Sequence, residues 1–471
     1  MDTPGRANAS WLRDDRHSLL LAGMVWTLIV LLIVPDGFDY QVLSNAYAPE
    51  SGGVLSRMLW LALLTGASIA ILWRASLAWL LLRALNPLLL AFVALAIVSI
   101  AWSIEPIVTM RRDIRLITIV LVCIAFTLSG WHSRRFQNVT RPILTLMLLG
   151  SIVFGLAAPT LAIHQETSPE LIGAWRGLTN HKNTLGALAC ITLIFWTQAW
   201  FSHQVRSTHA LFGCALAATC LWLSRSATSL ITAIFAVVFL GLLIRSPRSL
   251  QPYLKYGVAI VVLVLVVYAL AILQLIPGLS ILLAPITSLT GFDTTFTGRS
   301  AIWAIVSEHI SQNPFFGTGY GAYWTGPTTQ SPSYEFVLRM GNFYPGSAHN
   351  GYLEVVNDLG WVGLVCLLGY IVTHLRQSLR VLSADRPQGA LYLALFVQQA
   401  ITNLSESHWF SVLSVNFVVM TLATTALARI LLDRQLHARF GQPRSVQPIG
   451  AELIAVGRPT MTAVEHHRVP R

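Results

Sequence analysis

Twelve apolar stretches, each close to the length that spans a lipid bilayer, follow one another along this chain. A transmembrane helix needs about 20 mostly apolar residues, because its backbone must satisfy its hydrogen bonds internally. An outer-membrane barrel would show alternating strands of about ten residues instead. We therefore expect an all-α polytopic membrane protein with about twelve transmembrane helices. The stretches are 18–34, 57–73, 86–103, 114–129, 142–158, 183–200, 209–223, 227–244, 256–276, 351–373, 389–404 and 409–430.

The composition agrees with this class of protein. Of the 471 residues, 55% are hydrophobic and 11% are charged, whereas soluble domains carry about 25% charged residues. The formal net charge of +11 would suggest a nucleic-acid partner in a soluble protein. Here the positive-inside rule explains it, so no nucleic acid is expected. The five cysteines all lie in apolar stretches without metal-ligand spacing, and neither a metal nor a cofactor is expected.

The apolar stretches divide the chain into four parts. Residues 1–276 hold nine expected transmembrane helices, and residues 351–430 hold three more. Residues 277–350 form one large outer loop, rich in Gly, Pro and aromatic residues, which we expect to be folded. Residues 431–471 lack sustained periodicity and are expected to be a mostly disordered cytoplasmic tail. The seventh and eleventh stretches are short, and their length leaves open whether they cross the bilayer fully.

Twelve crossings place both termini on one side of the membrane. A cytoplasmic N-terminus puts most Lys and Arg residues inside, as the positive-inside rule requires. The cations left outside run against that rule and need another reason. They are Arg57, Arg111, Arg112, Arg115, Arg176, Lys182, Arg225, Arg299 and Arg339.

Four sites on the expected outer side place a cation or an imidazole beside small residues. Arg176, Lys182, Arg225 and Arg299 together suit a di-anionic group, because arginine forks bind phosphate oxygens and helix N-termini add N–H donors. The alternative for the arginines is contact with lipid headgroups. His181, between Arg176 and Lys182, is expected to have a structural hydrogen-bonding role and is also a candidate glycan contact.

The fourth site begins the helix expected from residue 351. Asn350, Glu354 and Asp358 are spaced i, i+4, i+8 and share one helix face, which must face protein or a wet cavity. His349 stands at the start of this helix and is the candidate catalytic residue. Glu354 or Asp358 would orient His349 or bind acceptor hydroxyls, and Asn350 is a further candidate glycan contact.

The large outer loop contains a short amphipathic helix and a glycine-aromatic turn. Ile302, Val306 and Ile310 repeat at helical spacing after Arg299, and Pro314 ends the pattern. In the turn that follows, alternate glycines allow backbone to approach a ligand, and aromatic rings offer faces to sugars. A tight turn with interfacial aromatics is the alternative. The candidate glycan contacts here are Tyr320, Tyr323 and Trp324.

Four strings in this order resemble the O-antigen ligase/polymerase family, which includes bacterial exopolysaccharide polymerases. They are RGLTNHKNTLGA (176–187), SRSATSL (224–230), GRSAIWAIVSEHISQNPFFGTGYGAYW (298–324) and AHNGYLEVVNDLGWVGL (348–364). The resemblance implies a membrane-embedded C-type, metal-independent, inverting glycosyltransferase. Its donor would be a glycan on undecaprenyl diphosphate, used outside the bacterial cytoplasmic membrane.

The resemblance also implies roles for single residues. His349 corresponds to the general base, and Arg225 and Arg299 correspond to the residues that bind the donor diphosphate. Histidine titrates near pH 6.5 and suits proton acceptance from a sugar hydroxyl, while fixed arginines stabilise the leaving diphosphate. Many members of the family have a second histidine two positions before the first, where this chain has Ser347.

The function expected is polymerisation of lipid-linked oligosaccharide repeats into exopolysaccharide or O-antigen. One alternative is a ligase that moves the glycan onto lipid A-core or a protein. A transporter or flippase is the alternative of another class, but transporters place ionisable residues in mid-helix, and here nearly all charges lie at segment ends. The expected partners are the lipid-linked donor and acceptor, the bilayer and a chain-length regulator; the sugar, the linkage and the oligomeric state are left open.

Overall fold

The computed structural model describes residues 17–35, 53–166, 171–272, 299–341 and 343–440. Within these ranges the protein is helical, and the extended pairing there is a single bridge between Ile163 and Trp175. The chain divides into two units, residues 1–432 and residues 433–471. The second unit is described only over 433–440, the end of the last helix. The first part of the expected outer loop, residues 277–298, lies outside the described residues, as does the tail beyond residue 440.

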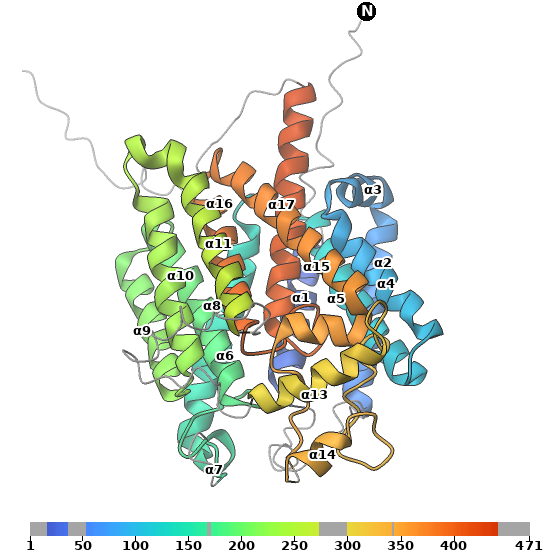
Figure 1. Ribbon diagram of the computed structural model, residues 1–471. Coiled ribbons are helices and arrows are strands. Elements are labelled where there is room, and N and C mark those ends of the chain that lie inside the picture. Colours follow the sequence, from blue (N-terminus) through green and yellow to red (C-terminus); the bar gives the residue numbers. More distant parts are fainter. Residues whose placement is uncertain (1–16, 36–52, 167–170, 273–298, 342, 441–471) are drawn as a thin grey trace, which may run out of the picture. The chain divides into compact units, whose positions relative to one another are not determined.

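The helices follow the apolar stretches closely (Figure 1). They are α1 (Ser18–Ile33), α2 (Val54–Trp73), α3 (Ala75–Ala84), α4 (Pro87–Val98), η5 (Ser99–Ala101), α5 (Pro106–Leu128), α6 (Arg135–Ala157), α7 (Pro159–Ala162), α8 (Lys182–Phe201), α9 (Ser207–Leu223), α10 (Ala227–Arg245), η6 (Arg248–Tyr253), α11 (Leu254–Ile272), α13 (Arg299–Gln312), α14 (Glu335–Arg339), α15 (Gly351–Leu382), α16 (Arg386–Thr402) and α17 (Val415–Phe440).

Each expected stretch coincides with a helix, but not every helix has the length and composition of a membrane span. Among the described residues, seven helices do, or eight if the bent pair formed by α3 and α4 counts as one span. The polytopic all-α class is therefore confirmed, whereas twelve crossings stay a prediction. Helix α13 is the short amphipathic helix expected after Arg299, with Ile302 and Val306 buried.

The expected stretch 86–103 begins at a sharp bend between α3 and α4, and α3 lies in the connection before it. The two helices meet at 101°, and Pro87 at the first position of α4 cannot continue a preceding helix. Asn86 caps α4, with its Oδ1 accepting from Leu88 N at 3.1 Å. Its Nδ2 donates to the carbonyl of Tyr370 at 2.9 Å, which holds the bend against α15.

Helices α8, α16 and α17 have most of their residues buried within the protein. Helix α8 packs against α9, α10 and α16, and α15 packs against α4 and α16. The span at α17 is 94% buried within the protein, whereas the span that contains α11 is 6% buried. Helix α17 is therefore a central helix, and α11 presents its apolar residues outward.

Helix α15 is broken at Gly360, whose φ of 63° and ψ of −162° are not helical. The backbone groups released by the break bond to the loop that follows α13. Trp361 N donates to Pro314 O at 2.8 Å, and Gly319 N donates to Asp358 O at 3.0 Å. Gly317 lies so close that an added Cβ would be 2.5 Å from the carbonyl of Asp358. The glycine turn therefore lets its backbone approach α15, which favours the tight-turn alternative.

Candidate functional site

Glu406 lies at the centre of a polar cluster where four helices begin or end. Its Oε1 accepts from Arg299 Nη2 at 3.0 Å and from Asn183 Nδ2 at 2.7 Å. Its Oε2 lies 3.3 Å from Nδ1 of His349. The three partners come from the start of α13, the start of α8 and the residues just before α15. One carboxylate thus joins three elements that are far apart in the sequence.

The turn that carries Glu406, residues 403–410 between α16 and α17, is held by its own first residue. Asn403 Oδ1 accepts from His408 N at 2.9 Å and from Trp409 N at 2.8 Å. The carbonyl of Asn403 accepts from Gly351 N at 2.9 Å, the first residue of α15. These bonds hold the Glu406 turn against the N-terminus of α15 and so against His349.

His349 has a left-handed backbone conformation, with φ of 47°. Such a conformation is uncommon for a residue other than glycine and clusters at functional sites. Asn350 follows as the N-cap of α15, with its Oδ1 accepting from Tyr352 N and Leu353 N at 3.0 and 3.1 Å. The N-cap of α15 therefore fixes the backbone position from which the His349 side chain extends. Donation from Nδ1 to Glu406 makes Nε2 the nitrogen that can accept a proton.

Glu354 contacts the backbone just before His349, and its predicted roles in orienting His349 or binding acceptor hydroxyls stay predictions. Its Oε2 accepts from Ala348 N at 2.7 Å and from Ser407 Oγ at 3.0 Å. Asp358 is buried beside the loop that fills the break in α15. The shared face of Glu354 and Asp358 therefore looks at protein, as their spacing predicted.

The charge state of Glu406 follows from its surroundings. Burial raises the pKa of a carboxyl, but the hydrogen bond from His349 and the positive charge of Arg299 outweigh it. The pKa of Glu406 is therefore held well below its usual range. The side chain of Glu406 is 16% exposed, so its charge is largely shielded from water.

Arg299 and His349 are also connected through Trp303, one helical turn after Arg299. Its indole Nε1 donates to the carbonyl of Ala348 at 3.0 Å. Residues at i and i+4 share a helix face, so the face of α13 that carries Arg299 also contacts the chain just before His349.

The start of α8 brings two neutral histidines to the cluster. His181 caps α8, with its Nδ1 accepting from Asn183 N at 3.2 Å. Nε2 of His164 accepts from Lys182 N at 3.1 Å, and its Nδ1 lies 3.0 Å from Glu166. Burial lowers the pKa of His181 to about 4, although Glu406 opposes this, and burial also lowers the pKa of His164. His181 thus has the structural role expected of it.

Arg225 lies in the turn between α9 and α10, at the same end of α8 as the cluster. Its φ is 49°, and its Nη1 donates to Ile172 O at 2.8 Å. The next residue, Ser226, packs against Gly186 of α8, where an added Cβ would lie 2.9 Å from Ser226 Cβ. Gly186 is one turn beyond Asn183. Arg225 therefore sits beside the first turns of α8, next to the 172–175 backbone.

Arg176 differs from the other predicted cations. It is 5% exposed, and its Nε donates to the carbonyl of Leu161 at 2.8 Å. This arrangement holds the segment before α8 in place. Its predicted role in diphosphate binding stays a prediction, and the burial favours a structural one.

The aromatics of the glycine turn are buried. Tyr320 donates its hydroxyl to the Phe410 carbonyl, and Tyr323 donates to Glu335 at 2.9 Å. Tyr323 and Trp324 belong to a hydrophobic core that the outer loop forms with α13 and α14. The burial of the three rings favours the alternative of a tight turn, and their role as glycan contacts stays a prediction.

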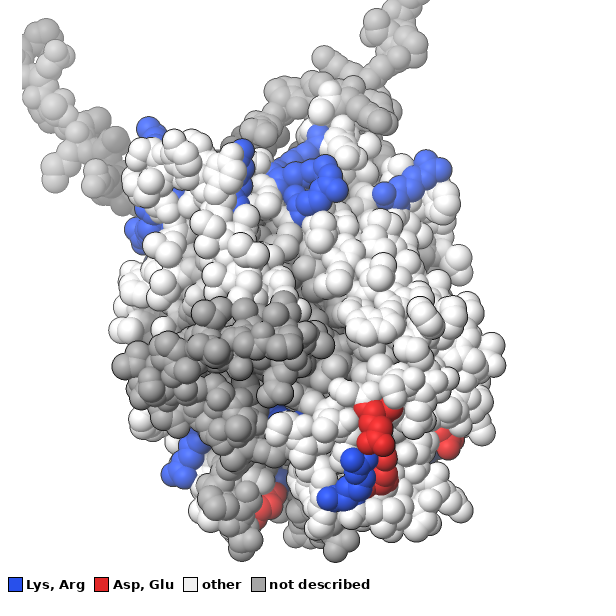
Figure 2. All heavy atoms as spheres, viewed as in Figure 1, with Lys and Arg blue, Asp and Glu red and all other residues white. Residues whose placement is uncertain are grey.

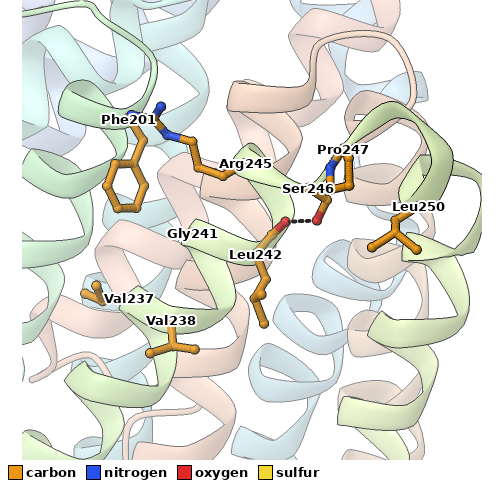
Figure 3. Close-up of a pocket in the computed structure, with 9 residues that line it drawn as sticks. All are labelled: Phe201, Val237, Val238, Gly241, Leu242, Arg245, Ser246, Pro247 and Leu250. Atoms are coloured by element: carbon orange, nitrogen blue, oxygen red, sulfur yellow. Dashed lines mark hydrogen bonds between the residues drawn. The ribbon is translucent and has the colours of Figure 1, made fainter.

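An apolar pocket of about 530 Å³ lies elsewhere, where α8 and α10 end (Figure 3). Its walls include Phe201, Gly241, Leu242 and Leu250, with Arg245 at the rim. Helix α8 is 20 residues long, so about 30 Å of helix separates this pocket from the cluster at its start. The pocket is therefore not part of the candidate site.

Several members of the cluster were missed from the sequence. Glu406, Asn183 and His164 were not singled out, although Asn183 belongs to the HKN string. Glu406 carried one usable signal: it is an acidic residue in a short connection between two apolar stretches, on the same side as the predicted outer cations.

Comparison with known proteins finds two similarities. Residues 212–368 match the family described as O-Antigen ligase. The chain is 29% identical over 316 residues to the exopolysaccharide production protein ExoQ of Rhizobium meliloti (strain 1021), covering 64% of this chain and 68% of that protein. The family match includes Arg225, Arg299 and His349 and ends within α15. The chain is thus a polytopic membrane protein similar to the O-Antigen ligase family and to an exopolysaccharide production protein.

Proposed function

We propose that the protein polymerises lipid-linked oligosaccharide repeats by an inverting, metal-independent glycosyl transfer. The observation that carries this proposal is the placement of His349 and Arg299 on one carboxylate, Glu406. A base and a cation held together at a helix end suit a reaction in which a hydroxyl loses a proton and a diphosphate leaves.

In this proposal the donor is a glycan on undecaprenyl diphosphate. A hydroxyl at the non-reducing end of the next repeat attacks the anomeric carbon, and its proton passes to Nε2 of His349. The bond between that carbon and the diphosphate oxygen breaks, and its electron pair stays on the diphosphate. Arg299 and Arg225 stabilise the charge that develops there. Attack opposite the leaving group inverts the configuration at the anomeric carbon.

The helix ends support an anionic substrate. Helices α8, α10, α13 and α15 begin at Lys182, Ala227, Arg299 and Gly351, each beside one of the four predicted sites. The N-terminus of a helix carries a partial positive charge. The first N–H groups of α8 and α15 already have partners, so these two ends contribute their partial charge alone. Together with Arg225 beside the start of α10 and Arg299 at the start of α13, the four ends favour a multiply charged group such as diphosphate.

The distribution of charge supports an outer location for this site. Lys and Arg side chains gather over α3 and over the ends of α10 and α15 (Figure 2). Helices α10 and α15 start near the cluster and end at the cationic side, with Arg245 and Arg380 in their last turns. By the positive-inside rule that side faces the cytoplasm of the bacterial cell. The cluster then faces outward, and both termini are cytoplasmic.

Two other functions are rivals to polymerisation as the activity of this site. The match to the O-Antigen ligase family favours, as the second candidate, transfer of the glycan to lipid A-core or a protein. A transporter would require no base at His349 and would move its substrate without changing it.

Purified protein, reconstituted with a defined lipid-linked repeat, tests these functions. A ladder of products on a gel supports polymerisation. A single new product on an added lipid A-core or protein acceptor identifies a ligase. Movement of unchanged substrate across proteoliposomes that survives His349→Ala identifies a transporter. If the wild-type protein yields neither a ladder nor a transfer product, the glycosyltransferase proposal is overturned.

A further inference from the structure

We propose that Glu406 is the positioning residue of this site, which holds the imidazole of His349 and the guanidinium of Arg299 as one unit. This inference rests on the proposed function. Glu406 does not contact the reacting atoms in this view; it acts by setting the tautomer of the base and the place of the cation.

The hydrogen bonds divide unequally between the two carboxylate oxygens. Oε1 accepts from both Asn183 Nδ2 and Arg299 Nη2, while Oε2 faces Nδ1 of His349. Both donors at Oε1 are N–H groups, so that position must stay an acceptor. The 403–410 turn, held by Asn403, keeps the carboxylate from moving away.

This division makes Glu406→Gln a sharp test. Two N–H donors at the Oε1 position require the glutamine to place its carbonyl oxygen there. Its NH₂ group then faces Nδ1 of His349, which must accept instead of donate. The proton of His349 moves to Nε2, the nitrogen that should receive the hydroxyl proton. A wrong tautomer in an otherwise intact site lowers turnover strongly, by about 10⁴-fold in the serine-protease example.

The same substitution has a different effect on donor binding. Glu406 places a negative charge beside the predicted diphosphate site, and like charges repel. Glutamine removes this charge but still accepts from Arg299 and Asn183. We therefore expect donor KM to be unchanged or lowered while kcat falls by about 100-fold or more. General damage to the fold would impair both constants together.

The experiment measures initial rates at varied donor concentration with purified full-length protein in lipid nanodiscs. Glu406→Gln is compared with Glu406→Asp, which keeps the charge and the tautomer and should recover at least about tenfold in kcat over the glutamine variant. Glu166→Gln is the matched control, because Glu166 also contacts a histidine, His164, at 3.0 Å. The control should keep the wild-type kcat, and thermal unfolding should show all variants folded.

Three results would overturn the inference: a Glu406→Gln variant with wild-type kcat, an aspartate variant no better than glutamine, or a rise in donor KM that accounts for the whole loss. Each of these leaves the proposed function standing, because the wild-type protein still makes product. Failure of the wild-type protein to transfer any glycan sinks the proposed function instead.

Discussion

Nδ1 of His349 and Nη2 of Arg299 contact opposite oxygens of the same carboxylate, at 3.3 and 3.0 Å. The proposed base and the proposed diphosphate-binding cation are therefore separated by a single side chain. Their positions depend on each other, because a displacement of Glu406 affects both. Single substitutions in this group should therefore change the rate of glycan transfer more than they change thermal stability.

His349→Ala should lower glycan transfer by about 10²–10⁴-fold, the usual contribution of a positioned acid or base. Protein level and thermal stability should hold. His203→Ala is the matched control: His203 also has a left-handed backbone, with φ of 54°, but lies exposed just after α8 ends. Both variants lose an imidazole under the same backbone strain. Product from His349→Ala at the wild-type rate would remove the base from the mechanism.

Arg225→Ala should lower turnover by about 10²–10³-fold, because one donor to the developing charge is lost. Arg225→Lys should recover little, since an ammonium cannot reproduce the planar fork of a guanidinium. The paired control is Arg206→Lys, an exposed cation just before α9, at the other end of that helix. Full activity in Arg225→Ala, measured with the same lipid-linked donor, would disprove the diphosphate assignment.

The features that could be predicted from the sequence were those with local signals. Apolar length placed the helices, and a cation or imidazole at a helix start marked His349 and Arg299 as site residues. Glu406 could not be reached in this way, because its partners lie 57 and 107 residues away. Its turn reads as an ordinary polar connection. The glycine-aromatic turn stayed ambiguous for a related reason: alternate glycines predict a close backbone approach but do not say whether a ligand or α15 approaches.

Gly351→Ala should destabilise the protein and lower its activity, opposite to the usual effect of alanine in a helix. An added Cβ would lie 1.8 Å from Asn403 Oδ1, and that oxygen already accepts from His408 N and Trp409 N. Relief of the clash must therefore shift the turn that carries Glu406.

Gly257→Ala in α11 is the control, since an added Cβ there meets nothing within 4 Å. It should leave activity unchanged and leave thermal stability equal or raised by up to about 1 kcal/mol. A Gly351→Ala protein with wild-type melting temperature and rate would contradict the close approach.

Acid should destabilise the protein through its buried neutral histidines. Burial lowers the pKa values of His181 and His408 to about 4, from an ordinary value of 6.5. Between these pH values the unfolded chain binds more protons than the folded protein, so the free energy of unfolding falls as the pH falls. The low pKa of Glu406 lowers the free energy of unfolding further only below the ordinary pKa of 4.5.

His181→Asn should flatten the dependence of melting temperature on pH between about 6.5 and 4.5, because asparagine still caps α8 but does not titrate. His203→Asn, at an exposed position, should keep the wild-type slope, and an equal slope in His181→Asn would show that His181 is not held neutral.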